Sequence, residues 1–319
     1  MNEHLSAQEN SWEAIFPSDI EANRSRLEKI IYQIGARRSL TNIQTVGCYP
    51  YTFSNLAVPE WIANSVLYTR SLNGHNVLVN IHENDEDINH RLVFILAATT
   101  EEALGILPKM GEILRYNQSF QLVIPIADRE FDDCEVERVV RALEFQIDRA
   151  EKPTSHAQMF WPSQEDFKFY YTLLEGDRLV EPLTLDLANE AKILYDENYP
   201  GHSFDAADLK NNLHQGIGRK VEQPHQLIAG CGRTQNIEIL SLGKRLSILT
   251  DAVVKEKFRG TGRMKFLTSS VATDAYKNGA NILALDAINY IAQAETEKLG
   301  AQFLAFHRWY RIARIKSSA

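Results

Sequence analysis

Short apolar runs alternate with amphipathic stretches along the first half of the chain. The apolar runs predict strands, and stretches whose apolar residues recur every three or four positions predict helices. The predicted strands are 75–81, 91–98, 120–126 and 167–174. The predicted helices are 20–36, 101–116 and 134–149, and the polar run 151–158 is expected to form a loop. A mixture of strands and helices in this order is typical of an α+β unit.

The second half repeats the alternation with more strands. The predicted strands are 178–185, 225–231, 237–242, 247–254, 281–287 and 302–309, with a turn at 233–236 between the second and third. Helices are expected at 187–195, at 205–213, after Gly262 and before Gly300. We place a domain boundary at 175–177. The prediction is an N-terminal α+β domain, 1–175, of unknown function, and a C-terminal α/β domain, 176–319, with a mixed twisted sheet flanked by helices.

A glycine-containing turn follows the predicted strand 247–254. Gly260 and Gly262 allow the backbone to bend sharply and to approach a ligand closely. The N–H groups at the start of the next helix, together with the helix dipole, favour an anion over this turn, most often a phosphate. Arg259, Arg263 and Lys265 are expected to add positive charge at the same place. The sequence therefore predicts a pyrophosphate-binding turn.

Two classes of ligand fit this turn. A dinucleotide motif has three glycines and an acid about 20 residues later. Asp286 ends the next predicted strand, but Lys265 stands where the third glycine would be. The alternative is the coenzyme A turn of the GNAT acyltransferases, which the chain resembles at Arg259 and Gly262 and departs from at Met264, where the family has a small residue.

Downstream residues extend the resemblance to the GNAT family over roughly 178–310. Asn289, Ala292 and Gly300 keep the family's order and spacing, whereas Thr296 stands at the position of its tyrosine. A weaker similarity to the β-lysine acetyltransferase-like branch is carried by Tyr199-Pro200-Gly201-His202 and by Thr250-Asp251. The N-terminal domain, which has no comparable glycine turn, is expected to be a degenerate GNAT-like copy without a phosphate site.

The resemblance implies an N-acyltransferase that moves an acyl group from acetyl-CoA to a primary amine of a small molecule. The residues that would bind the coenzyme are Val253, Val254, Arg259, Gly260, Thr261, Gly262, Arg263, Met264 and Asn289. Asp251 is the first candidate for the base that accepts the amine's proton, and Glu238 is the second. Thr296, in the place of the tyrosine that protonates the leaving thiolate, is a far weaker acid than a phenol.

Two other functions stay open on the sequence. One is a non-catalytic, CoA-binding or degenerate GNAT protein that acts as a regulator or scaffold, which the departures at Met264 and Thr296 favour. The other is an NAD(P)-binding oxidoreductase, which the dinucleotide interpretation of the turn implies.

The composition of the chain limits the classes of molecule that it is expected to bind. The net charge is −8 and the pI is about 5.7, which argues against general nucleic-acid binding and would attract a cationic amine. We find neither a secretion signal nor an apolar run long enough to span a membrane, so we expect a cytoplasmic protein. Cys48, Cys134 and Cys231 form no metal-binding or disulfide pattern, and no metal is predicted. A homodimer is compatible with all of this.

Overall fold

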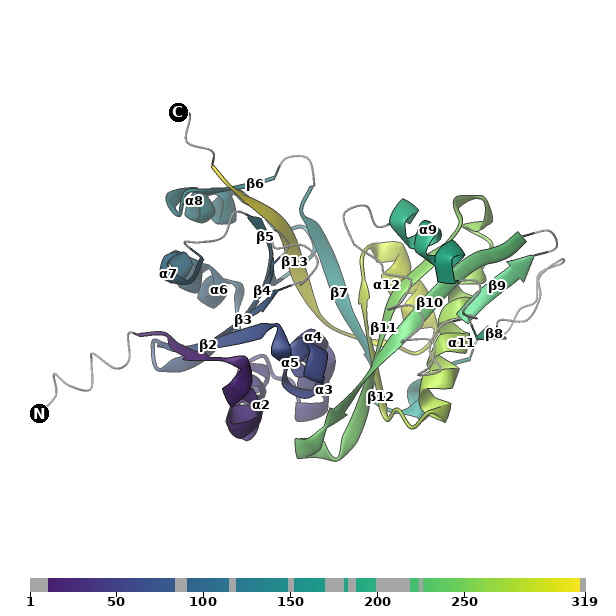
Figure 1. Cartoon of the computed structure of the whole chain (residues 1–319), viewed down its shortest axis with the longest axis horizontal. Coiled ribbons are helices and arrows are strands. Elements are labelled where there is room, and N and C mark those ends of the chain that lie inside the picture. The colour runs from purple at the N-terminus through teal and green to yellow at the C-terminus, as the bar shows by residue number, and fades with distance from the viewer. Residues whose placement is uncertain are drawn as a thin grey trace, which may run out of the picture. The chain divides into compact units, whose positions relative to one another are not determined.

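The computed structural model describes residues 11–83, 91–114, 119–148, 152–169, 181–182, 188–198, 219–223 and 226–315. The chain packs as two compact units. Unit 1 comprises residues 1–158 together with 304–319, and unit 2 comprises residues 159–303. The boundary expected at 175–177 lies outside the described residues. Figure 1 shows the elements of both units.

Unit 1 contains helices on both faces of a mixed sheet. Its helices are α2 (Pro17–Arg37), α3 (Asn42–Cys48), α4 (Pro50–Ala57), α5 (Pro59–Ala63), α6 (Thr100–Ile106), the 3₁₀ helix η1 (Leu107–Met110), α7 (Gly111–Leu114) and α8 (Cys134–Ala142). Its strands are β1 (Glu13–Ile15), β2 (Ser65–Leu72), β3 (His75–Glu83), β4 (Arg91–Leu96), β5 (Ser119–Ile126) and β6 (Phe145–Ile147). Most of β7 (Thr154–Trp161) and of β13 (Gln302–Arg314) also belongs to this unit.

The strand order in unit 1 is β1-β2-β3-β4-β5-β13, and β6 also pairs with β13. β4 and β5 run parallel, and the other pairs are antiparallel. One face buries Val93 and Ile95 in an apolar core with residues of α6 and α8. Phe94 points to the opposite face, where its ring stacks on that of Tyr51 in α4. The two sets of helices in Figure 1 therefore cover opposite faces of this sheet.

Two helices predicted for unit 1 are shorter in the structure, because single residues interrupt the helical backbone. The helix expected at 101–116 is broken into α6, η1 and α7, because Pro108 lacks the N–H that would continue it. The helix expected at 134–149 ends at Ala142, since Glu144 adopts a left-handed conformation with φ of 65° and leads into β6. At each break the periodic pattern of apolar residues continues, but the backbone leaves the α-helical conformation.

In two further places, an expected loop is a strand and the start of an expected strand is not. The expected loop 151–158 is largely strand β7. Its sequence is polar, but Ser155 and Ala157 are buried at alternate positions. Phe167 to Phe169, expected to begin a strand, lie outside any strand. Phe167 instead packs its ring against Trp161 and Tyr276, whereas Phe169 is 50% exposed. The remainder of the expected strand 167–174 lies outside the described residues.

Unit 2 also has a mixed sheet covered by helices. Its strands are β8 (Glu181–Pro182), β9 (Arg219–Gln223), β10 (Gln226–Ile239), β11 (Lys244–Val254) and β12 (Ile282–Ala287). Its helices are η2 (Gln164–Asp166), α9 (Ala188–Asn198), η4 (Leu240–Leu242), η5 (Glu256–Phe258), α11 (Arg263–Lys277) and α12 (Tyr290–Lys298). The strand order is β12-β11-β10-β9-β8, with β11 and β12 parallel and the other pairs antiparallel.

The main correction in unit 2 concerns β10. The turn expected at 233–236 is absent, because these residues pair continuously with β11. The chain reverses instead at η4 and Gly243, whose φ of 57° suits glycine. β9 was not predicted, and the helix expected at 205–213 lies outside the described residues. Of the strand expected at 178–185, the structure describes Glu181–Pro182.

The two units repeat one topology. In each, two parallel strands are connected through a helix: β4 and β5 through α6, and β11 and β12 through α11. In each, three antiparallel strands lie on the same side of the parallel pair in the sheet order: β1, β2 and β3 in unit 1, and β8, β9 and β10 in unit 2. β13, the last strand of the chain, lies beside β5 in unit 1. The N-terminal half is thus a second copy of the arrangement in the C-terminal half.

Candidate functional site

The candidate site begins where β11 and β12 separate. Their parallel pairing runs from Leu246 opposite Ile282 to Leu249 opposite Leu285. β11 then continues to Val254 and stays paired with β10 on its other side. In the described part of the chain, the β12-facing edge of residues 250–254 therefore has no partner strand. Such an edge presents backbone N–H and C=O groups to an extended ligand.

A β-bulge lies in this open segment. Thr250 pairs with Arg233 and Val253 with Cys231, so three steps along β11 match two along β10. The extra residue falls at Asp251–Ala252. Bulges bend a strand and redirect its side chains, and they are frequent beside active sites. The backbone of Asp251, the first candidate base, is thus in the bulge and within the open edge, whereas its side chain lies outside what the structure describes.

The glycine turn follows β11 after the short helix η5. Gly260 and Gly262 have φ of 73° and 82°, which side chains with a Cβ rarely adopt. Gly262 is the N-cap of α11 and provides no side chain to cap it. No capping side chain therefore accepts from the first N–H groups of this 15-residue helix. The helix dipole adds positive potential at the same end. These are features that favour an anion, and anion binding at this turn stays a prediction.

The three cations that the sequence predicts to add positive charge at the turn each contact a protein group in the structure. Arg259 donates from Nε to the carbonyl oxygen of Val254 at 3.1 Å. Arg263 is buried, donates to the Thr261 hydroxyl at 2.9 Å and lies 4.9 Å from the centre of the Phe258 ring.

Lys265 contacts Glu295 of α12 at 2.7 Å, and this contact lowers the pKa of the Glu295 carboxyl. These bonds fix the turn to β11 and α12. Phe258 and Glu295, which take part in them, were not predicted as part of the site, because neither belongs to a recognisable motif.

Residues of the second predicted motif lie around α12. Asn289 is the N-cap of this helix, and its Oδ1 accepts from the Ala292 N–H at 2.9 Å. Thr296 is buried, and its hydroxyl lies 2.9 Å from the Ala292 carbonyl and 2.8 Å from that of Gln293. That hydroxyl is therefore bonded within its own helix. Met264 is 39% exposed, so its larger side chain points outward rather than filling the turn.

Glu238, the second candidate base, lies away from the open edge. It pairs with Arg245 across β10 and β11, near the start of β11, and the two side chains form an ion pair at 2.6 Å. Asp251 is six residues further along the strand, which corresponds to about 20 Å. Asp251, Val253 and Val254 therefore lie at the end of β11 that precedes the glycine turn, whereas Glu238 lies beside its opposite end.

Comparison with solved structures decides what kind of arrangement this is. A GCN5-related N-acetyltransferase from Sphaerobacter thermophilus aligns with a TM-score of 0.58 and 12% identity, over 97% of each chain. A tandem GNAT protein from the clavulanic acid biosynthesis pathway aligns with a TM-score of 0.53 and 11% identity, over 97% of this chain and 100% of that one. The chain has the fold of the GCN5-related N-acetyltransferases.

Other comparisons add to this result at the level of the fold. A Drosophila protein aligns with a TM-score of 0.61 and 10% identity, over 96% of this chain and 99% of that one. No protein-family model matches the sequence, and no curated protein matches it. The alignment with a tandem GNAT protein over its full length agrees with two GNAT-like units in one chain. The likeness is structural, because every identity quoted is at or below 12%.

The GNAT turn differs between the two units. In unit 1 the segment between β4 and α6 contains no glycine, and Thr99 caps α6 by accepting from the Glu102 N–H at 3.2 Å. Glu102 also accepts from the Ala98 N–H at 3.0 Å and pairs with Arg37. Protein groups thus occupy the place that an anion would take, and Glu101 and Glu102 oppose one electrostatically. That unit 1 lacks a phosphate site remains a prediction, which these contacts favour.

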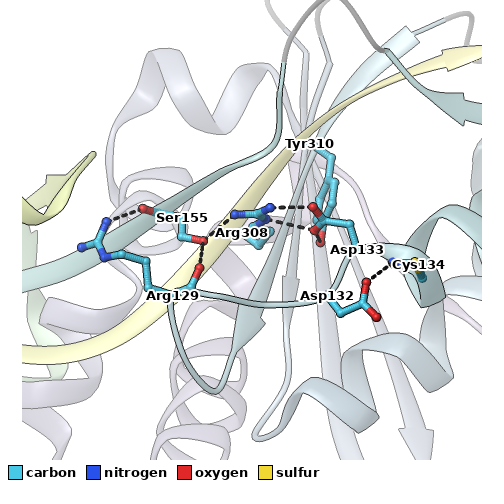
Figure 2. Close-up of polar contacts among 7 residues, drawn as sticks. All are labelled: Arg129, Asp132, Asp133, Cys134, Ser155, Arg308 and Tyr310. Atoms are coloured by element: carbon cyan, nitrogen blue, oxygen red, sulfur yellow. Dashed lines mark hydrogen bonds and ion pairs between the residues drawn. The ribbon is translucent and has the colours of Figure 1, made fainter.

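A polar network holds the loop after β5 in unit 1 (Figure 2). Arg308 of β13 makes a two-point ion pair with Asp133, at 3.0 and 2.5 Å, and donates to the Ser155 hydroxyl at 2.7 Å. Tyr310 donates to the same Asp133 carboxylate at 2.8 Å. Burial and this bond raise the pKa of Tyr310. Ser155 and Arg129 bond to each other's backbone carbonyls at 2.8 and 2.9 Å.

Replacing Arg308 with methionine is expected to destabilise unit 1 by about 2 kcal/mol, because three charge-assisted bonds are lost from a largely buried guanidinium. Urea unfolding measures the change. Arg138→Met is the control: its pair with Glu135 is highly exposed at 3.5 Å, and we expect less than about 0.5 kcal/mol. Equal effects of the two substitutions would show that the network contributes nothing specific.

Among the described residues, no cluster of three or more His, Cys, Asp or Glu side chains could hold a metal ion. None of the described helices is both long and apolar enough to cross a membrane. The segment Tyr199-Pro200-Gly201-His202, which carried the weaker resemblance, lies outside the described residues.

Proposed function

We propose that unit 2 is an acyl-CoA-dependent N-acyltransferase, and specifically an N-acetyltransferase that acts on a primary amine of a small molecule. One observation carries the proposal: the open edge of β11 is followed, after the short helix η5, by a glycine turn at a helix N-terminus that has no side-chain cap. A ligand with an extended arm attached to a pyrophosphate fits an open strand edge followed by such a turn. Acetyl-CoA is such a molecule, and no metal is needed to hold it.

The chain's residues would bind the coenzyme in two places. The N–H groups at the start of α11, beside Gly260, Thr261 and Gly262, would receive the pyrophosphate. The backbone of Val253 and Val254 would pair with the amide groups of the pantetheine arm as a strand pairs with its neighbour. Asn289 uses its carbonyl oxygen to cap α12, which leaves the amide nitrogen as the atom that would donate to the same arm.

The chemistry then follows from the position of the bulge. The amine nitrogen attacks the thioester carbonyl, the oxyanion is stabilised by a backbone N–H of β11, and the C–S bond breaks to release the thiolate. Asp251 would accept the proton that the amine loses. A thiol has a pKa of about 8.5, so its anion is a tolerable leaving group without an acid. Transfer therefore does not require Thr296, whose hydroxyl is bonded to its own helix.

A non-catalytic CoA-binding protein, acting as regulator or scaffold, is the second candidate. Two placements favour it: Thr296 is directed into its helix, and Glu238 is held by Arg245 far from the turn. The strand pairing disfavours the oxidoreductase alternative. The strand that leads into a dinucleotide turn belongs to a mostly parallel sheet, whereas β11 is antiparallel to β10.

We place the reaction in the cytoplasm, without a nucleic-acid or membrane partner and with a homodimer as the candidate assembly. The net charge of −8 would draw a cationic amine toward the protein, and the attraction would weaken as salt rises.

A thermal-shift panel of acetyl-CoA, CoA, NADH and NADPH tests the proposal. Acetyl-CoA at about 100 times its Kd is expected to raise Tm by about 5–10 °C, and the nicotinamide cofactors to have no effect. Release of CoA thiol on adding a set of primary amines then separates the two candidates. Binding without thiol release would favour the non-catalytic protein, and a shift with NADH alone would refute both.

A further inference from the structure

Two asparagine side chains in unit 1 are buried without hydrogen bonds. Asn55 in α4 and Asn80 in β3 are both 0% exposed. In the structure as described, neither the carboxamide oxygen nor the nitrogen of either residue has a partner. Buried amides are nearly always satisfied, because an unpaired one lowers the stability of the folded state. Two complete amides left unpaired in one unit therefore point to a function for this position.

The two amides lie in the same layer, between the sheet and α4. Asn80 is directly opposite Phe94 in the register of β3 and β4, so both side chains point to the same face. Tyr51 of α4 stacks on Phe94, with ring centroids 5.8 Å apart and planes 17° apart. Asn55 follows Tyr51 by one helical turn and shares its side of the helix. One amide thus comes from the sheet and the other from the helix that covers it.

Aromatic rings surround this layer. Trp61 of α5 stacks on Tyr51 at 6.2 Å and on His82 at 4.8 Å. Trp309 of β13 meets Phe94 edge-on at 5.7 Å, and its buried Nε1 likewise has no partner among the described residues. Flat apolar walls with a few convergent polar groups are typical of sites for small molecules. The unpaired groups are all neutral.

We propose that Asn55, Asn80 and the rings around Phe94, together the Asn55–Asn80 cluster, bind a small neutral molecule with a planar amide edge. An amide presents a donor and an acceptor side by side and complements the carboxamide of asparagine at both atoms. The indole N–H of Trp309 can be satisfied only by an acceptor. A carboxylate of the same shape lacks the donor and would bring an uncompensated charge into a buried position. The site is independent of the glycine turn and of the proposed acyl transfer.

Benzamide is the probe for this proposal, with sodium benzoate as the matched charged molecule. In thermal melts of the full chain, benzamide at millimolar concentration is expected to raise the Tm, and benzoate is expected to leave it unchanged. Asn80→Leu and Asn55→Leu should each remove the benzamide shift. Absence of a benzamide shift in the parent protein, or an equal shift with benzoate, overturns the proposal.

The second measurement requires no ligand. Because leucine is similar in size and has no polar group to leave unpaired, Asn55→Leu and Asn80→Leu are expected to raise the Tm of the ligand-free protein by about 2–4 °C. Asn76→Leu, at an exposed position of the same strand and face, controls for the general effect of leucine in a strand and should not change the Tm. A lowered Tm in both buried variants would show that water satisfies the amides, and it would overturn the proposal.

Discussion

Replacing Gly262 with aspartate is expected to weaken acetyl-CoA binding at least about 100-fold, which corresponds to about 2.7 kcal/mol. The residue is the N-cap of α11 at φ of 82°. A carboxylate there would stand where the pyrophosphate is expected, so that two anions would compete for the same N–H groups. Isothermal titration with acetyl-CoA measures the loss.

Gly262→Asn is the matched control for this substitution. Asparagine and aspartate have nearly the same shape, and both tolerate the left-handed conformation better than other side chains. The two variants should therefore melt at similar temperatures. If the asparagine variant loses as much affinity as the aspartate variant, the effect is steric and the charge argument fails. Parental affinity in the aspartate variant would remove the turn from the binding site.

Replacing Asp251 with asparagine is expected to lower turnover at neutral pH by about 100- to 10,000-fold, the usual effect of losing a positioned base. Acetyl-CoA affinity should be nearly unchanged, since the carboxylate is expected to face the acceptor amine. Part of the rate should return at higher pH, where more of the amine is already neutral. Steady-state rates across a pH series, together with the melting temperature of the variant, measure both effects.

Glu238→Gln is the control, because this carboxylate is bound to Arg245 at the far end of β11. It should reduce stability slightly and leave the rate unchanged. A purely structural role for Asp251 predicts a lower Tm and a rate loss that does not recover with pH. Parental turnover in Asp251→Asn with a rate loss in Glu238→Gln would reverse our assignment of the base.

The fold could be predicted from the sequence wherever local pattern and long-range pairing agree. The strand before the glycine turn was expected at 247–254 and is found at Lys244–Val254, because its apolar run is flanked by glycines. The predictions failed where a single residue interrupts the backbone, as at Pro108 and Glu144. They also failed at β7, where strand pairing rather than composition decides the structure.

The site was predictable to the extent that it depends on backbone conformation. The two glycines at 260 and 262 are visible in the sequence, and in the structure both have the positive φ values that favour glycine. The directions of the charged side chains were not predictable, because Arg263 and Lys265 are placed by Phe258 and Glu295, through cation–π and ionic contacts that no spacing rule reveals. Asn80 is one of several polar residues in the predicted strand 75–81, and its missing partners could be seen only in the structure.

The position of β13 has a consequence for synthesis on the ribosome. β5 ends at Ile126, yet the strand that pairs with it ends at Arg314. At ordinary elongation rates the intervening residues take about 10–40 s to emerge. The nascent chain must therefore carry an unpaired strand edge throughout that time, which invites aggregation.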